Sequence, residues 1–189
     1  MKETNNTIRI SFTAMMAAMI YVLTMFRFPF LGSKLHFANA LCLLSGLLLG
    51  PVYGGLAAGL GSGLYDALAG GYGLVEALIT FASKFAMAWV CGRIARQAHA
   101  RKGMPDRTAL ACVAGALTYV ALYMLKTFIF NAFVYGYPMS TVGATMVSKL
   151  VPSLINAAFA FICAPIFYHA VVPALRKGGV LRHMSPHIE

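Results

Sequence analysis

Charged residues are scarce in this chain, and acidic residues are scarcer still. Only 11% of the 189 residues are charged, and Asp and Glu together number five. An ordinary soluble domain has about a quarter of its residues charged and about half of them apolar, whereas this chain is 60% hydrophobic. That excess excludes an ordinary soluble domain and predicts that much of the chain faces lipid.

The sequence also lacks the motifs of nucleotide hydrolysis and of common catalytic sites. It contains no G-x-x-x-x-G-K-[ST] loop for phosphates, no H-E-x-x-H zinc helix and no G-x-S-x-G nucleophile elbow. Its four cysteines lie in apolar stretches without a C-x-x-C pair, which is typical of small buried side chains. We therefore expect no catalytic residue, no metal and no cofactor, and any ATP-driven step requires another subunit.

What the sequence has instead is a series of continuous apolar runs. A helix needs about 20 apolar residues to cross a bilayer, and these runs do not alternate as the strands of a membrane barrel do. We predict an all-α integral membrane protein, a single transmembrane domain over 1–189 that forms a six-helix bundle. The expected helices cover about 9–26, 36–50, 52–70, 74–95, 108–134 and 141–175.

The uncharged stretch at 35–65 allows either one kinked helix or two short helices joined at Gly50-Pro51, because proline lacks an amide donor and restricts its predecessor. The basic residues decide between them, since Lys and Arg are retained on the cytoplasmic side. With two helices, ten of the fifteen fall on one side, namely Lys2, Arg9, Arg93, Arg96, Arg101, Lys102, Arg107, Arg176, Lys177 and Arg182. We predict a multi-pass cell-membrane protein with both termini in the cytoplasm and no nucleic-acid partner.

Polar side chains inside the predicted membrane helices indicate a cavity that opens toward the outer side. An ionisable group at the bilayer centre costs about 3 kcal/mol or more unless it is paired or hydrated. Lysines that reach the interface, or that pair with carboxylates, are the alternative. The predicted substrate-binding residues are Asn39, Asp66, Tyr72, Glu76, Lys84, Lys126, Asn131, Tyr135, Lys149 and Asn156.

Small residues at four-residue intervals predict two flat helix faces. Gly55, Gly59 and Gly63 lie on the third expected helix, and Ala14 and Ala18 lie on the first. Such faces let another backbone approach closely. We expect the glycines to pack within the bundle and the alanines to form an interface with a separate protein.

The stretch LHFANALCLLSGLLLGPVYGGLAAGLGSGLYDALAGG at 35–71 resembles the second and third helices of S components of energy-coupling factor (ECF) vitamin transporters. Lys84 in ITFASKFAMAWVCGRI resembles the family's fourth helix, and Pro152 with Asn156 resembles its sixth. The resemblance implies a six-helix subunit with a small-molecule pocket near the outer face. It also implies docking through Ala14 and Ala18 on a transmembrane coupling (T) subunit, which works with two cytosolic ATPase subunits.

The resemblance leaves the ligand open among water-soluble vitamins and related micronutrients. Lysines, carboxylates, asparagines and tyrosines suit a polar ring with donors and acceptors, so we expect a vitamin such as pyridoxine or hydroxymethylpyrimidine. A queuosine precursor or riboflavin is the next expected ligand. Two alternatives are a structural or assembly protein without a ligand, and a membrane-embedded enzyme that uses Asp66, Glu76 and a lysine. The enzyme is disfavoured because two carboxylates are fewer than lipid-metabolising metal sites need.

Overall fold

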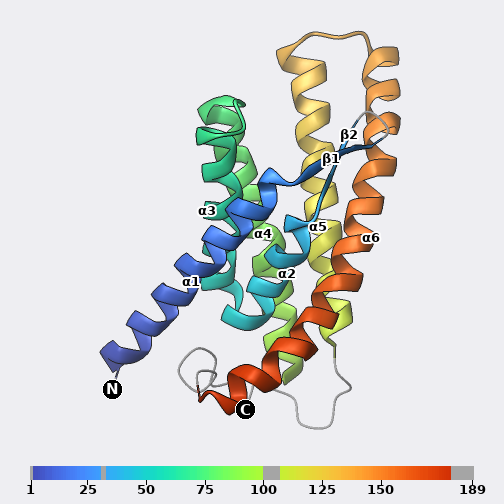
Figure 1. Cartoon of the computed structure of the whole chain (residues 1–189). Coiled ribbons are helices and arrows are strands. Elements are labelled where there is room, and N and C mark those ends of the chain that lie inside the picture. The colour runs from blue at the N-terminus through green and yellow to red at the C-terminus, as the bar shows by residue number, and fades with distance from the viewer. Residues whose placement is uncertain (1, 31–32, 100–106, 180–189) are drawn as a thin grey trace.

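The computed structural model describes residues 2–30, 33–99 and 107–179, with their side chains at 6–26, 36–97 and 107–179. Arg101, Lys102 and Arg182 of the predicted cytoplasmic set lie outside the described residues. Six α-helices form the bundle in Figure 1 and confirm the predicted all-α membrane fold. They are α1 Lys2–Met25, α2 Ala38–Leu49, α3 Pro51–Leu68, α4 Gly73–His99, α5 Thr108–Ile129 and α6 Met139–Lys177.

The helices differ in how they relate to lipid. Within the described part of the chain, α1, α4, α5 and α6 contain segments long and apolar enough to cross a membrane. Helix α2 has only 12 residues, all of them buried, and contacts α1, α3, α4 and α6. Although α2 is almost wholly apolar, it therefore packs as a central helix inside the bundle.

The chain reverses between α2 and α3 at Gly50-Pro51, which excludes the single kinked helix. Gly50 has a φ of 80°, a conformation that favours glycine, and Pro51 occupies the first turn of α3. The Arg96 guanidinium fills the space beside Gly50, where a Cβ would lie 2.2 Å from Nη2. Arg96 also donates to the Leu49 carbonyl at 3.4 Å, so a cation lies at the C-terminal end of α2.

The three glycines at four-residue intervals pack α3 against α4, as expected from the sequence. A Cβ on Gly55 would lie 2.9 Å from the Phe85 ring, and one on Gly59 would lie 2.9 Å from the Phe81 ring. Gly63 continues this contact against the side chain of Phe81. The missing side chains allow the close approach of the two helices.

The segment between α1 and α2 contains a β-hairpin. Strand β1 (Arg27–Phe30) pairs antiparallel with β2 (Ser33–His36). Pro29 cannot donate a ladder hydrogen bond but is tolerated in a two-stranded sheet, where every strand is an edge. The hairpin connects α1 to α2, and β2 contacts α6.

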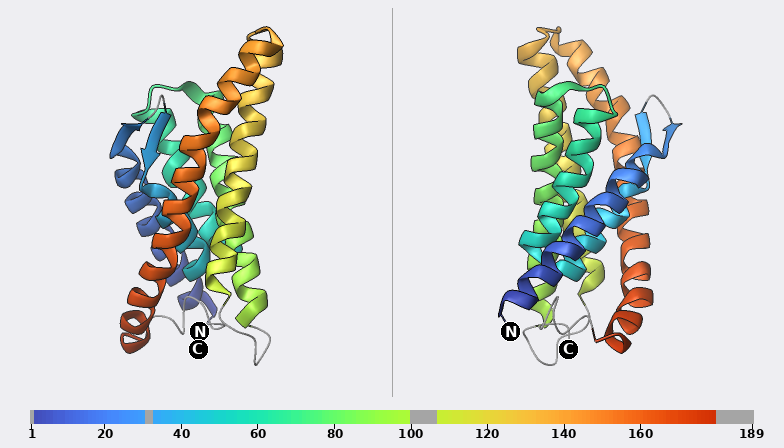
Figure 2. Two further views of the ribbon diagram at one scale, coloured as in Figure 1. Left: turned by 90° about the vertical axis from the view of Figure 1, so that its right-hand side faces the viewer. Right: turned by 60° about the vertical axis from the view of Figure 1, so that its left-hand side comes forward.

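The two ends of the bundle differ in shape (Figures 1 and 2). Helix α1 begins and α6 ends at one end, which also holds the reversal between α2 and α3. At the opposite end, α5 and α6 extend beyond the other helices and are joined there. We call the end where α1 begins and α6 ends the closed end, and the opposite end, where the cavity described in the next section lies, the cavity end.

Candidate functional site

A cavity of about 670 Å³ lies among the last turns of α1, α3 and α5 and the first turns of α2 and α4. Nine of the ten predicted substrate-binding residues line it. One of them, Lys149, lies on α6, which forms a further wall. These nine are Asn39, Asp66, Tyr72, Glu76, Lys84, Lys126, Asn131, Tyr135 and Lys149. Cavities that hold small ligands have volumes of roughly 300–1,000 Å³, so the space is large enough for a vitamin.

Lys84 lies deepest among the charged groups of the cavity. It is 5% exposed, eleven residues into α4, and donates a hydrogen bond to Oδ1 of buried Asn39 at the start of α2. Its Nζ lies 3.7 Å from the centroid of the Tyr119 ring. No carboxylate among the described residues lies within ion-pair distance of Lys84. An amide and an aromatic face thus surround this ammonium, which leaves donor capacity for a ligand.

An aromatic wall rises from Lys84 along α5. The rings of Tyr119 and Tyr123 are nearly parallel, with centroids 6.2 Å apart, and both residues line the cavity. Phe130 lies on the same wall, and Lys126 Nζ is 5.7 Å from its ring centroid. Flat apolar surfaces with hydroxyl groups at their edges suit a planar polar ring.

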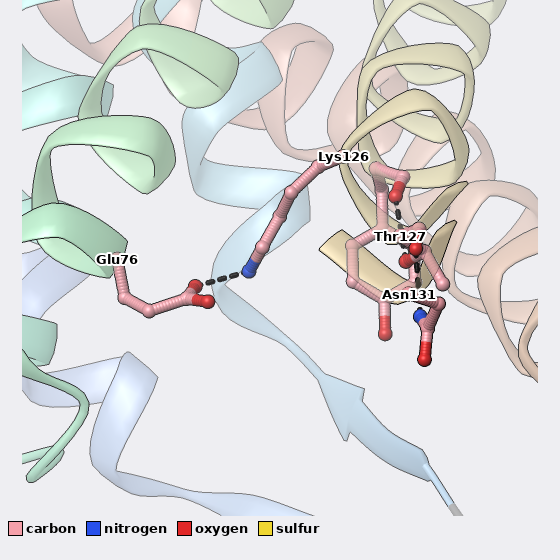
Figure 3. A network of polar contacts seen from close by, with 5 residues as sticks. Glu76, Lys126, Thr127 and Asn131 are labelled. Atoms are coloured by element: carbon pink, nitrogen blue, oxygen red, sulfur yellow. Dashed lines mark hydrogen bonds and ion pairs between the residues drawn. The ribbon is translucent and has the colours of Figure 1, made fainter. Parts of the chain in front are cut away.

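Nearer the mouth of the cavity, one ion pair connects two of its walls. Figure 3 shows Glu76 of α4 and Lys126 of α5 pointing toward one another, and Nζ contacts Oε2. Their side chains are 26% and 23% exposed. The pair neutralises one of the cavity's lysines, so Lys84 and Lys149 are the cations outside it.

The last turn of α5 opens into a π-helical turn, Phe130–Val134, at the edge of the cavity. Asn131 is buried within it and donates from Nδ2 to the Thr127 carbonyl at 2.6 Å, as drawn in Figure 3. Tyr135 follows the turn and is 57% exposed. Both predicted residues therefore reach the cavity from one short irregular segment.

Asn156 is the predicted residue that lies outside the cavity lining. Its Oδ1 accepts a hydrogen bond from the His36 backbone N–H at 2.8 Å, which connects α6 to β2. Asn156 thus holds the hairpin, and His36 lines the cavity in its place. The sequence offered no sign of this contact, because it joins residues 120 positions apart.

Several lining residues were missed. They are mostly hydroxyl-bearing or aromatic, and they are Thr24, His36, Ser62, Thr80, Ser83, Tyr119, Tyr123, Thr127 and Phe130. Helical spacing from the predicted residues could have identified some of them, because Tyr119, Tyr123 and Phe130 share a helix face with Lys126. Thr80 likewise lies four residues after Glu76.

The predicted interface residues Ala14 and Ala18 are both exposed on α1. Met15 and Met19 beside them are 48% and 46% exposed. The opposite side of α1, which includes Ile20, is buried against the bundle. The alanines therefore face outward and leave a shallow strip between larger apolar side chains.

The described residues contain no group of three or more His, Cys, Asp or Glu side chains that could hold a metal ion. Glu76 is paired with Lys126, and the cavity presents hydrogen-bonding groups around a space. The geometry is that of a binding site.

Two matches place the chain among known proteins. Residues 4–173 match the family model described as ECF-type riboflavin transporter, S component. A solved structure of the S component of a bacterial ECF transporter matches with a TM-score of 0.67 and 16% identity. That match covers 93% of this chain and 99% of the other. No curated protein matches the chain.

The family's name points to riboflavin, whereas the residues alone favoured a pyridoxine-type ligand ahead of it. A transporter subunit of this kind is not an enzyme, so the predicted absence of catalysis agrees with the family. The match spans nearly the whole chain and its fold agrees with that of a solved S component. The chain belongs to the S-component family of ECF-type riboflavin transporters and is a substrate-binding membrane subunit of an ECF importer.

Proposed function

We propose that this subunit captures riboflavin on the outer side of the cell membrane for ATP-driven import. The observation that carries the proposal is the cavity of about 670 Å³ with an aromatic wall and a lysine at its base, in a chain of this family. An isoalloxazine ring has flat faces for Tyr119 and Tyr123. Its carbonyls accept hydrogen bonds, as Lys84 requires, and the ribityl hydroxyls suit the polar groups nearer the mouth.

Cavity size favours riboflavin over pyridoxine. Pyridoxine and hydroxymethylpyrimidine have one six-membered ring each, and a single ring leaves much of this space to water. The mixed charges of Asp66, Glu76 and Lys149 still suit pyridoxine, which makes it the second candidate. The two ligands differ in how many walls of the cavity they contact at once.

Ligand-dependent thermal stabilisation of the purified subunit tests this assignment. A ligand that binds the native state raises its stability by RT ln(1 + [L]/Kd). Riboflavin is expected to raise the Tm, and binding is expected to quench its fluorescence, with pyridoxine, hydroxymethylpyrimidine and thiamine as comparison compounds. Stabilisation by pyridoxine alone would reassign the ligand. Stabilisation by none of the compounds would favour the assembly protein without a ligand.

We also propose that the cavity end faces outward and that both termini lie in the cytoplasm. Arg9, Arg93, Arg107 and Arg176 lie near the start of α1, the end of α4, the start of α5 and the end of α6, all at the closed end. Lys and Arg are retained on the cytoplasmic side. A membrane-impermeant maleimide added to whole cells is expected to label Tyr137→Cys and not Arg107→Cys. The reverse pattern would invert the subunit.

The third part of the proposal concerns partners: a T subunit docks on the strip formed by Ala14 and Ala18, and two cytosolic ATPase subunits supply the energy. Ala14→Trp or Ala18→Trp would fill the strip that a partner helix needs. Each is expected to abolish copurification with the T subunit while riboflavin binding is retained. Leu117→Trp, at a 51% exposed position of α5, is the matched control. Intact assembly in both alanine variants would remove α1 as the docking face.

A further inference from the structure

The π-turn at the end of α5 has a hydrogen-bond register that an α-helix does not have. The Tyr135 N–H donates to the Phe130 carbonyl, five residues earlier, at 2.9 Å. In an uninterrupted α-helix the same amide would donate to Asn131, four residues earlier. The turn therefore contains one residue more than a regular turn.

This extra residue decides where Tyr135 points. Five residues of α-helix rotate by about 500°, which would place Tyr135 about 140° around the axis from Phe130. The wider turn instead returns Tyr135 over Phe130, and the two ring centroids lie 6.3 Å apart. Both residues line the cavity.

The last two residues of the turn are largely exposed, although the Phe133 ring contacts that of Phe128, with centroids 6.2 Å apart. Phe133 and Val134 are 76% and 62% exposed. Single π-turns within α-helices are frequent at functional sites, and this one adjoins the cavity. The side chains that it directs inward are Phe130, Asn131 and Tyr135.

We propose that the π-turn is a specificity-determining element, which holds Tyr135 as the outermost part of the aromatic wall so that a planar ring of the ligand packs against it. The proposal rests on the proposed function, because it assigns a ring-bearing ligand to the same cavity. Tyr135 contacts the ligand ring directly, and the turn sets the direction of its side chain.

Insertion and deletion of one residue have opposite expected effects. Deletion of Phe133 places Tyr135 four residues after Phe130, where a regular α-turn keeps the two in line. Riboflavin affinity is then expected to stay within about threefold of the wild type. Insertion of an alanine after Ala132 places Tyr135 six residues after Phe130. Phe133→Ala is included in this variant, because Phe133 would otherwise stand four residues after Phe130 and in line with it. The insertion variant is expected to bind riboflavin at least tenfold more weakly, about 1.4 kcal/mol, with Phe133→Ala alone as the control.

A rescue variant separates register from damage to the fold. In the insertion variant, Val134 occupies the position five residues after Phe130, so Val134→Tyr restores an aromatic ring there. We expect this change to recover riboflavin affinity in the insertion variant and to leave it unchanged in the wild-type background. Tyr135→Ala is expected to lose affinity, and Tyr135→Phe to keep it. Equal affinities of the insertion and deletion variants, with no rescue, would overturn the proposal.

The register is also measurable without a ligand, which separates this proposal from the proposed function. Phe130→Cys with Tyr135→Cys is expected to be bridged by a reagent that fluoresces only when it joins two neighbouring thiols, with each single variant as control. When the same two cysteines are placed in the deletion and insertion variants, the reagent is expected to bridge them in the deletion variant and not in the insertion variant. Absence of bridging at wild-type spacing would overturn the register. Failure of the wild type to bind riboflavin would count against the ligand, and the variants are then compared with whichever vitamin stabilises the subunit.

Discussion

Helix α2 connects two regions that are built in opposite ways. Toward the closed end, backbones touch: a Cβ on Gly46 would lie 2.4 Å from the Ala88 carbonyl oxygen, and one on Gly54 would lie 2.4 Å from that of Ser45. At the cavity end, Asn39 in the first turn of α2 accepts a hydrogen bond from the tip of Lys84, a long side chain from α4. Rigid glycine contacts at one end allow long polar side chains to keep a space open at the other.

The largest expected effect comes from breaking the closed end. Gly54→Val places a branched side chain against the Ser45 carbonyl, and overpacking of this kind costs about 1–3 kcal/mol or more where backbone must move. We expect a marked fall in the Tm of the purified subunit and in its yield. Gly143→Val is the control, because nothing lies within 4 Å of a Cβ on Gly143. Equal Tm values for the two variants would contradict the comparison.

The next effect concerns the cavity end. Lys84→Met keeps the length and apolar stem of the side chain. It removes a buried charge but also the hydrogen bond to Asn39, and because these two effects oppose each other, only a small change in Tm is expected. Riboflavin is expected to bind at least tenfold more weakly, about 1.4 kcal/mol, as measured by fluorescence quenching. Lys177→Met at the closed end is the control. Unchanged affinity in Lys84→Met would remove Lys84 from the binding site.

The smallest effect is expected for the ion pair at the mouth. Partly exposed pairs contribute about 0–1 kcal/mol, so Glu76→Gln and Lys126→Met should each change the Tm only slightly. A double-mutant cycle of the two measures their coupling directly. A coupling energy well above 1 kcal/mol would show that this pair stabilises the cavity end as strongly as glycine packing stabilises the closed end.

The sequence predicted the parts of the fold and the site that depend on local pattern. Apolar runs located the helices, and Gly50-Pro51 with the basic residues indicated the reversal. Five acidic or basic side chains in and beside the apolar runs pointed to a cavity, because an ionisable group in a membrane helix needs a partner or water, and four polar neighbours completed the nine cavity residues. These signals lie within single helices.

What the sequence did not predict depends on contacts between distant segments or on backbone irregularity. Asn156 contacts β2, and no spacing within α6 distinguishes that from a cavity position. The β-hairpin at Arg27–His36 is too short and too mixed in composition to show alternation. The π-turn leaves the apolar pattern of α5 unchanged, so the direction of Tyr135 follows only from the hydrogen bonds.

The shortness of α2 has a consequence for energy use. Its twelve residues span about 18 Å, whereas the hydrocarbon core of a bilayer is about 30 Å thick. Asn39 lies in the first turn of α2, and Lys84 of α4 contacts it there. In the proposed orientation, a ligand that reaches Lys84 has already crossed a substantial part of the membrane by diffusion alone. If the proposed ATPase subunits drive import, they would have to move the ligand only across the remaining, glycine-packed part.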